Sequence, residues 1–171
     1  MEIKTSEAYK RISQFYGTRK AERSQVPLIQ HIDEGLQILA WLNASDWAMQ
    51  AYCLHPVLQS DADLLANWQA DFGQTDSQTL ILCMEYRKTA NAYLSKREIA
   101  SIQEIELAPI EEVNQMLVAD KVQNFKDFRR YHAQTHPRAE VLNQYFLNWL
   151  ERLGVSMGQF EEWEKGLMKG T

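Results

Sequence analysis

The sequence predicts an all-α fold of about eight helices in a single domain that spans residues 1–171. Three observations support this prediction. The chain has only 7 glycines and 4 prolines, so residues that interrupt helices are sparse. Apolar residues recur every three to four positions along most of the chain, which is the spacing of a helix face buried in a core. No stretch alternates apolar and polar residues between hairpin turns, so we expect no β-sheet.

Four helices are expected in the first part of the chain. The first apolar stripe consists of Ile3, Tyr9, Ile12, Phe15 and Tyr16. A turn-like segment at residues 25–27 precedes the second stripe, which consists of Ile32, Leu36, Leu39 and Leu42. Ser45 is a favourable N-cap for a third helix that runs to His55. Asp61 or Asp63 can cap a shorter fourth helix.

A break and a loop are expected in the middle of the chain. Gly73 interrupts the helical pattern, and Asp76 opens a long fifth helix that reaches Leu94. Residues 96–109 are less periodic, which predicts a loop containing no more than a turn of helix.

The last three helices have clear start signals. The longest helix is expected to begin at Pro109, because proline is favourable in the first turn of a helix, and to continue to about His132. Pro137 opens the seventh helix in the same way. Ser156 and Gln159 form the pattern of a capping box at the start of the eighth.

Composition limits the kinds of partner that the chain suits. Lys and Arg number 18 against 23 Asp and Glu, so the formal net charge is −5. This balance argues against broad binding to nucleic acid, which needs a basic face, but it leaves room for a small phosphorylated ligand. No apolar run has the length of a membrane span, and we expect a cytoplasmic protein without membrane association. The two cysteines, Cys53 and Cys83, have no zinc-type spacing and imply no disulfide framework.

Three polar residues lie inside apolar helical stretches: His31 in VPLIQH, His55 in AYCLHP and Asp120 in LVADKVQN. Their order and surroundings resemble the HD superfamily of metal-dependent phosphohydrolases, most closely the RelA/SpoT-type (p)ppGpp hydrolase domain. The resemblance covers about residues 8–132. It implies an HD-like helical bundle in which these three residues bind a divalent Mn, Fe or Zn ion, which assists hydrolysis of a phosphate ester.

The chain departs from this family directly after His55. The family has an aspartate there that also binds the metal, and this chain has Pro56. Loss of a negative ligand lowers the affinity for a cation. Proline also disfavours helical geometry at the preceding residue and removes a backbone donor toward Tyr52. We therefore expect the metal to be bound weakly or to be absent.

The residues that would orient the attacking water are also altered. Where the family has a Glu-Asp pair, this chain has Gln59 and Ser60. Asp61 and Asp63 follow closely and are candidate substitutes. The resemblance thus makes Gln59, Asp61 and Asp63 the candidate catalytic residues.

A simpler interpretation of His31 and His55 stays open, because they can be core or rim histidines in a domain that has lost its metal. A separate pair, His132 and His136, has the spacing of metal ligands on one helix face, but Pro137 favours a helix end there.

Arg87 and Asn91 are candidates for binding an anion, because they share one face of the fifth helix. An arginine among apolar neighbours requires a negative partner. That partner is either a ligand phosphate or a protein carboxylate such as Glu34 or Asp120.

The resemblance adds three more candidate ligand-binding residues. Lys121 and Asn124 follow Asp120 in a stretch similar to the family's Ala-Asp-Arg-Leu-His-Asn segment, which places Asn124 near a ribose or phosphate. Arg23 precedes His31 much as a basic residue that packs on the guanine base does in the family.

Three functions therefore remain open at the level of sequence. The chain is a nucleotide or alarmone phosphohydrolase with an altered metal site, or a non-catalytic HD-fold protein that binds a nucleotide or a protein partner. The third possibility is an interaction module with an empty cavity. Nothing in the sequence excludes a homo-oligomer.

Overall fold

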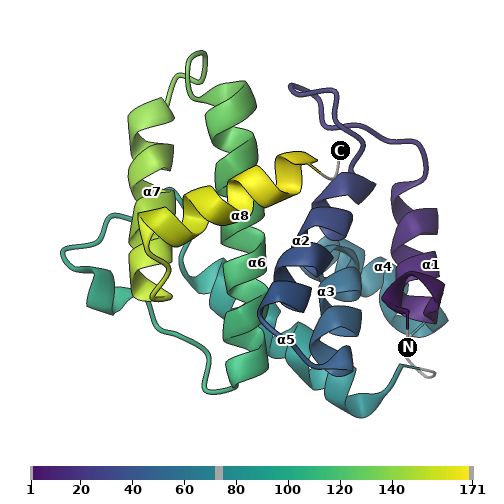
Figure 1. Ribbon diagram of the computed structural model, residues 1–171. Coiled ribbons are helices and arrows are strands. Elements are labelled where there is room, and N and C mark those ends of the chain that lie inside the picture. Colours follow the sequence, from purple (N-terminus) through teal and green to yellow (C-terminus); the bar gives the residue numbers. More distant parts are fainter. Residues whose placement is uncertain (1, 72–74, 170–171) are drawn as a thin grey trace.

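The computed structural model describes residues 2–71 and 75–169, except for the side chains of residues 68–71. The expected break at Gly73 lies outside the described residues. Within them the protein is all-helical, with eight α-helices and no β-strand, as the sequence predicts (Figure 1). None of the described helices is long and apolar enough to cross a bilayer.

The helices have the following bounds: α1 (Glu7–Tyr16), α2 (Ile29–Trp41), α3 (Asp46–Leu58), α4 (Asp61–Asp71), α5 (Ser77–Ala92), α6 (Glu111–Asp127), α7 (Ala139–Arg152) and α8 (Met157–Lys169). Three shorter elements accompany them: the 3-10 turns η1 (Ile3–Thr5) and η3 (Ile102–Glu104), and the π-helical turn η4 (Phe128–His132), which continues α6. Ile3 thus lies in a separate turn before the first helix. The loop expected at residues 96–109 contains one 3-10 turn.

The expected start signals hold at α3 and α5. The Ser45 side chain accepts a hydrogen bond from the backbone N–H of Ala48, 3.2 Å away. Asp76 caps α5 in the same way. The expectation that Asp61 or Asp63 caps α4 is wrong. The Ser60 hydroxyl accepts from the Asp63 backbone N–H at 3.0 Å and donates to the Asp63 carboxylate at 2.6 Å, so Ser60 is the capping residue.

Helices α3 and α6 lie at the centre of the bundle. Helix α3 packs against α1, α2, α4, α5 and α6, and α6 packs against α2, α5, α7 and α8 (Figure 1). Their fully buried large side chains include Tyr52 on α3 and Phe125 on α6. This arrangement brings α2, α3 and α6 together, and each of them carries one of the three residues that the resemblance singles out.

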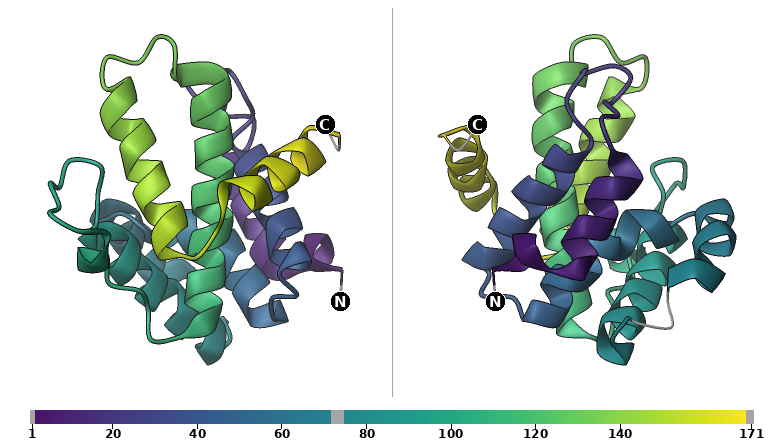
Figure 2. Two further views of the ribbon diagram at one scale, coloured as in Figure 1. Left: turned by 60° about the vertical axis from the view of Figure 1, so that its left-hand side comes forward. Right: turned by 90° about the vertical axis from the view of Figure 1, so that its right-hand side faces the viewer.

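Two loops lie at one end of the bundle. The segment that joins α1 to α2 and the segment that joins η4 to α7 lie at the same end of the molecule in all three views (Figures 1 and 2). Ser24 in the first segment and His132, the last residue of η4, line one common pocket. The segment between α1 and α2 therefore forms part of the wall of the site described next.

Candidate functional site

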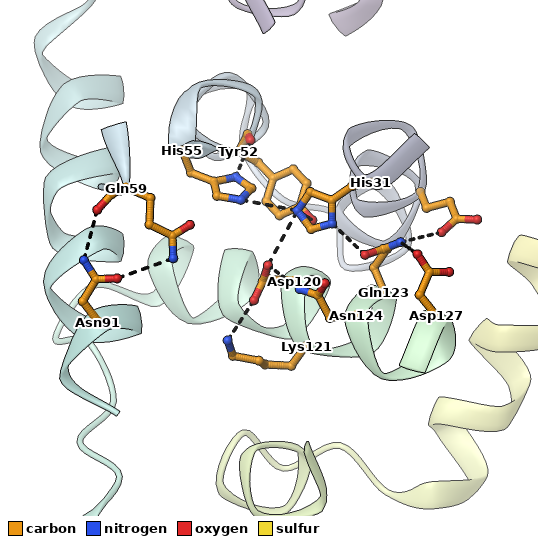
Figure 3. A network of polar contacts seen from close by, with 11 residues as sticks. His31, Tyr52, His55, Gln59, Asn91, Asp120, Lys121, Gln123, Asn124 and Asp127 are labelled. Atoms are coloured by element: carbon orange, nitrogen blue, oxygen red, sulfur yellow. Dashed lines mark hydrogen bonds and ion pairs between the residues drawn. The ribbon is translucent and has the colours of Figure 1, made fainter. Parts of the chain in front are cut away.

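His31 on α2, His55 on α3 and Asp120 on α6 point toward one another (Figure 3). The His31 Nε2 atom lies 3.4 Å from His55 Nε2 and 3.6 Å from Asp120 Oδ1. One ligand atom from each of the three residues lies within 4.8 Å of the others. Within the described part of the chain, this is the only group of three or more His, Cys, Asp or Glu side chains close enough to hold a metal ion.

His55 stays in the helix despite the proline that follows it. Helix α3 continues through Pro56 to Leu58, so the expected displacement of His55 from helical geometry is wrong. Because Pro56 has no N–H, the Tyr52 carbonyl lacks its usual helical donor. The His55 Nδ1 atom lies 2.6 Å from this carbonyl oxygen and replaces that donor. The hydrogen of His55 is therefore on Nδ1, and its Nε2 lone pair faces His31.

Burial keeps His55 uncharged. Its side chain is almost fully enclosed, and rings of Tyr52 and Tyr86 pack on it with centroids 4.7 and 4.8 Å away. Burial, together with neighbouring His31, lowers the pKa of His55 to about 3. A neutral imidazole is the form that binds a metal ion.

Asp120 is a buried carboxylate that remains ionised. Burial alone would raise its pKa, but Lys121 and His31 outweigh this effect and lower the pKa to about 2. Its Oδ2 atom pairs with Lys121 Nζ at 2.9 Å, and its Oδ1 atom accepts a hydrogen bond from the Asn124 amide at 2.8 Å. Two of the candidate ligand-binding residues therefore hold this carboxylate in place.

Lys121 is itself enclosed by aromatic rings. Its ammonium group lies 5.1 Å from the ring centre of Trp149 and 5.5 Å from that of Tyr145, both on α7. It is buried against α7 and also lines the pocket. Its most direct role in this arrangement is to orient Asp120.

His31 is held by a side chain rather than by the backbone. Its Nδ1 atom lies 2.6 Å from Gln123 Oε1. The Gln123 amide nitrogen in turn donates to Glu34 at 3.0 Å and to Asp127 at 2.8 Å, and Lys126 pairs with both of these carboxylates. This buried polar network lies directly behind the cluster (Figure 3).

The three residues open into a pocket of about 440 Å³, which we call the cluster pocket. Its walls include Tyr16, Ser24, His31, His55, Asp120 and Asn124. Arg23 is exposed beside Ser24 and is not part of this lining. His132 lines the pocket, whereas His136 accepts a hydrogen bond from the Arg138 backbone at 3.0 Å.

A second compartment of about 580 Å³ adjoins the cluster pocket, and Pro56 and Gln59 line both. It contains the remaining candidate residues, Asp61, Asp63, Arg87 and Asn91. The two aspartates line this compartment and do not line the cluster pocket.

The polar residues of the second compartment bind one another. Arg87 pairs with the exposed carboxylate of Asp61. The two carboxylates that the sequence suggested as its protein partner have other partners, because Glu34 pairs with Lys126 and Asp120 pairs with Lys121. Asn91 donates to the Gln59 carbonyl at the end of α3, 3.1 Å away.

Three residues at or directly behind the cluster were not identified from sequence. Gln123 and Tyr52 both contact His31, the latter through a hydroxyl 3.4 Å from Nε2. Gly35 on α2 allows the Tyr52 ring to approach, because a Cβ atom at position 35 would lie 2.1 Å from that ring. A glycine inside an apolar helical stretch is a recognisable signal of close packing, but it does not name the partner.

No family model matches the chain, and neither a curated protein nor a solved structure shows significant similarity to it.

Proposed function

We propose that this protein is an HD-type phosphohydrolase that uses a divalent Mn, Fe or Zn ion to hydrolyse a phosphate ester of a nucleotide or an alarmone such as (p)ppGpp. The observation that supports this proposal most strongly is the convergence of His31, His55 and Asp120 in one pocket. A neutral imidazole with its Nε2 lone pair directed inward and an ionised carboxylate are suitable ligands for such a cation.

Each residue of the cluster has a defined part in this proposal. His31, His55 and Asp120 would hold the ion, and three protein ligands leave coordination positions for substrate. When bound, the ion would polarise a phosphoryl oxygen and lower the pKa of a water molecule. Lys121 and Asn124 fix the carboxylate of Asp120. With one carboxylate among the ligands, the affinity for the ion should be modest.

The two compartments suit a ligand with separated polar groups. Their volumes, about 440 and 580 Å³, fall in the range of small-molecule sites, which is roughly 300–1,000 Å³. Arg87 provides a cation in the second compartment, and its buried Nε–H has no hydrogen-bond partner among the described residues. A phosphate there would replace the exposed Asp61 carboxylate. Asn124 would then contact the sugar or another phosphate, with the base toward Arg23.

Binding without hydrolysis is the second candidate function. Gln59 lines the cluster pocket where the resemblance expects an acidic residue. Asp61 and Asp63 are engaged by Arg87 and Ser60 in the second compartment. These contacts favour a non-catalytic protein that retains the pocket and binds a nucleotide or a protein partner.

Turnover and binding assays on the same protein distinguish the two functions. Chelator-treated protein is reloaded with Mn²⁺ and incubated with (p)ppGpp and a panel of nucleotides, and released phosphate and pyrophosphate are measured. The control is His31→Gln, at a partly exposed position. Turnover that depends on Mn²⁺ and is lost in the control supports the phosphohydrolase. Nucleotide binding without turnover supports the second candidate. The absence of both contradicts the phosphohydrolase and the nucleotide-binding form of the second candidate.

The proline at position 56 permits a direct test of the metal site. Pro56→Asp supplies a carboxylate next to His55, so the affinity for Mn²⁺ should rise in a calorimetric titration. Pro56→Asn is the matched control, because it restores the same backbone N–H toward Tyr52 without adding charge. Equal affinity for Mn²⁺ in both variants and the wild type would argue that His55 is not a ligand.

A further inference from the structure

Gln123 occupies the centre of the buried network behind His31. Its side chain is only 1% exposed, and all of its polar atoms have partners. The amide nitrogen donates to Glu34 Oε2 at 3.0 Å and to Asp127 Oδ2 at 2.8 Å. The amide oxygen faces His31 Nδ1 at 2.6 Å. A residue placed only to fill space would not need this set of contacts.

The two carboxylates determine which way the amide points. An amide NH₂ group has two hydrogens, and here each has a carboxylate acceptor. Rotating the amide by half a turn would place its oxygen against both Glu34 and Asp127, with no hydrogen between them. Lys126, which is 1% exposed, pairs with Glu34 at 2.9 Å and with Asp127 at 2.6 Å and offsets their charge. The orientation of the amide is therefore fixed by its surroundings rather than by His31.

The amide orientation determines the tautomer of His31. Since Gln123 Oε1 can only accept a hydrogen bond, His31 Nδ1 must carry the hydrogen. The neutral ring then has its lone pair on Nε2, the atom that faces His55 Nε2 and Asp120 Oδ1 and lies 3.4 Å from the Tyr52 hydroxyl. His55 reaches the same tautomer by a different route, through the Tyr52 carbonyl.

We propose that Gln123 is a positioning residue that selects the His31 tautomer and so presents His31 Nε2 to a cation in the cluster pocket. The cation itself rests on the proposed function above. Partners of this kind commonly change metal affinity by about 10- to 100-fold when they are removed. The network thus extends the candidate site to Glu34, Lys126 and Asp127, none of which needs to touch the ligand.

The chain contains a matched control for Gln123. Gln30 donates to the other oxygen of Glu34 at 2.9 Å, so it belongs to the same network. Its side chain forms this hydrogen bond to Glu34 and none to His31. Gln123→Met and Gln30→Met each remove one amide from Glu34 and keep a similar volume. Only the first removes the acceptor of His31.

The experiment measures the tautomer and the metal affinity separately. Nitrogen-15 NMR of metal-free protein, at a pH where the rings are neutral, identifies which nitrogen of His31 carries the hydrogen. We expect Nδ1 in the wild type and in Gln30→Met, and a shift toward Nε2 in Gln123→Met. A calorimetric titration with Mn²⁺ should show affinity about 10- to 100-fold lower in Gln123→Met only.

The two measurements can contradict the positioning role of Gln123 and the proposed metal-dependent function separately. A wild-type His31 with its hydrogen on Nε2 overturns the positioning role, even where a variant does not fold. A tautomer or affinity that is unchanged in Gln123→Met also overturns it. If the wild-type tautomer is as expected but no Mn²⁺ binds, the proposed metal-dependent function fails, and the Gln123→Met spectrum still decides whether Gln123 sets the tautomer.

Discussion

The cluster pocket and the second compartment hold their polar side chains in different ways. In the cluster pocket the ion pair between Asp120 and Lys121 is buried, with both side chains 8% exposed. In the second compartment Arg87 is 21% exposed and its partner Asp61 is 88% exposed. The first pair is enclosed by helices α6 and α7, whereas the second reaches from α5 to the first residue of α4.

This difference indicates which part of the site is fixed and which can change partners. When a buried charge loses its partner, no water replaces that partner, so breaking the pair costs much free energy. The geometry of a buried pair is therefore strongly maintained. An exposed ion pair contributes little, because water solvates either charge almost as well. The cluster pocket is therefore suited to hold an ion in a set position. Arg87 is suited to exchange Asp61 for an incoming anion.

The largest expected effect compares the two carboxylates directly. Asp120→Asn leaves Lys121 buried without a counter-charge, and it should reduce the free energy of unfolding by about 3–5 kcal/mol. Asp61→Asn, the matched substitution in the second compartment, should change it by about 0–1 kcal/mol. Urea denaturation of both variants measures the difference. Similar losses in the two variants would remove the distinction between the compartments.

A second test concerns the close packing behind the cluster pocket. Gly35→Ala would place a Cβ atom 2.1 Å from the Tyr52 ring, so the ring must move. We expect a loss of about 1–3 kcal/mol in unfolding free energy, as for other overpacked cores. Gly158→Ala on α8 is the control, since the nearest atom to its new Cβ is 4.0 Å away. This control should be neutral or slightly stabilising, because alanine favours helices.

The result is informative in either direction. Thermal unfolding that gives the same melting temperature for Gly35→Ala and Gly158→Ala would mean that Tyr52 is not held tightly against α2. The conclusion that the cluster pocket has a fixed geometry would then be wrong where Tyr52 packs against α2.

The sequence predicts the presence of the helices well, because local signals determine them. The expected starts at Pro109 and Pro137 are wrong by two residues, since α6 begins at Glu111 and α7 at Ala139. The caps at Ser45 and Asp76 follow from residue types that satisfy the first N–H groups of a helix. The start of α4 was assigned to the wrong residue, because Ser60 and Asp63 both carry suitable oxygens. Which of them accepts depends on backbone geometry at that turn, and composition does not specify it.

Pro56 shows why a correct local rule can give a wrong site geometry. Proline does remove a backbone donor toward Tyr52, as expected from sequence. The expected disturbance of His55 does not occur, because its own side chain takes the position of that donor. Backbone propensities do not describe side-chain hydrogen bonds. They therefore do not predict that the His55 side chain donates to the Tyr52 carbonyl that proline leaves without a donor.

Partners distant in sequence could not be assigned. Gln123 and Glu34 are separated by 89 positions, and only the packing of α2 on α6 brings them together. The partner of Arg87 was left open between a ligand and two carboxylates that the fold places elsewhere. Its actual partner, Asp61, depends on where α4 lies beside α5, which no periodicity within a single helix determines.

The smallest expected effect on stability, and the sharpest test of the second compartment, is Arg87→Met. This change keeps most of the side-chain volume and removes the charge. Because Asp61 is exposed, the unfolding free energy should change by only about 0–1 kcal/mol. The affinity for nucleotides that carry a pyrophosphate should fall by about 2–3 kcal/mol, as for a lost charge-assisted hydrogen-bond pair. Lys88→Met is the control, since Lys88 forms a similar surface pair with Glu85 at 3.0 Å and does not line the compartment. A destabilised Arg87→Met protein whose nucleotide affinity equals that of Lys88→Met would show that Arg87 has a structural role and does not bind the ligand.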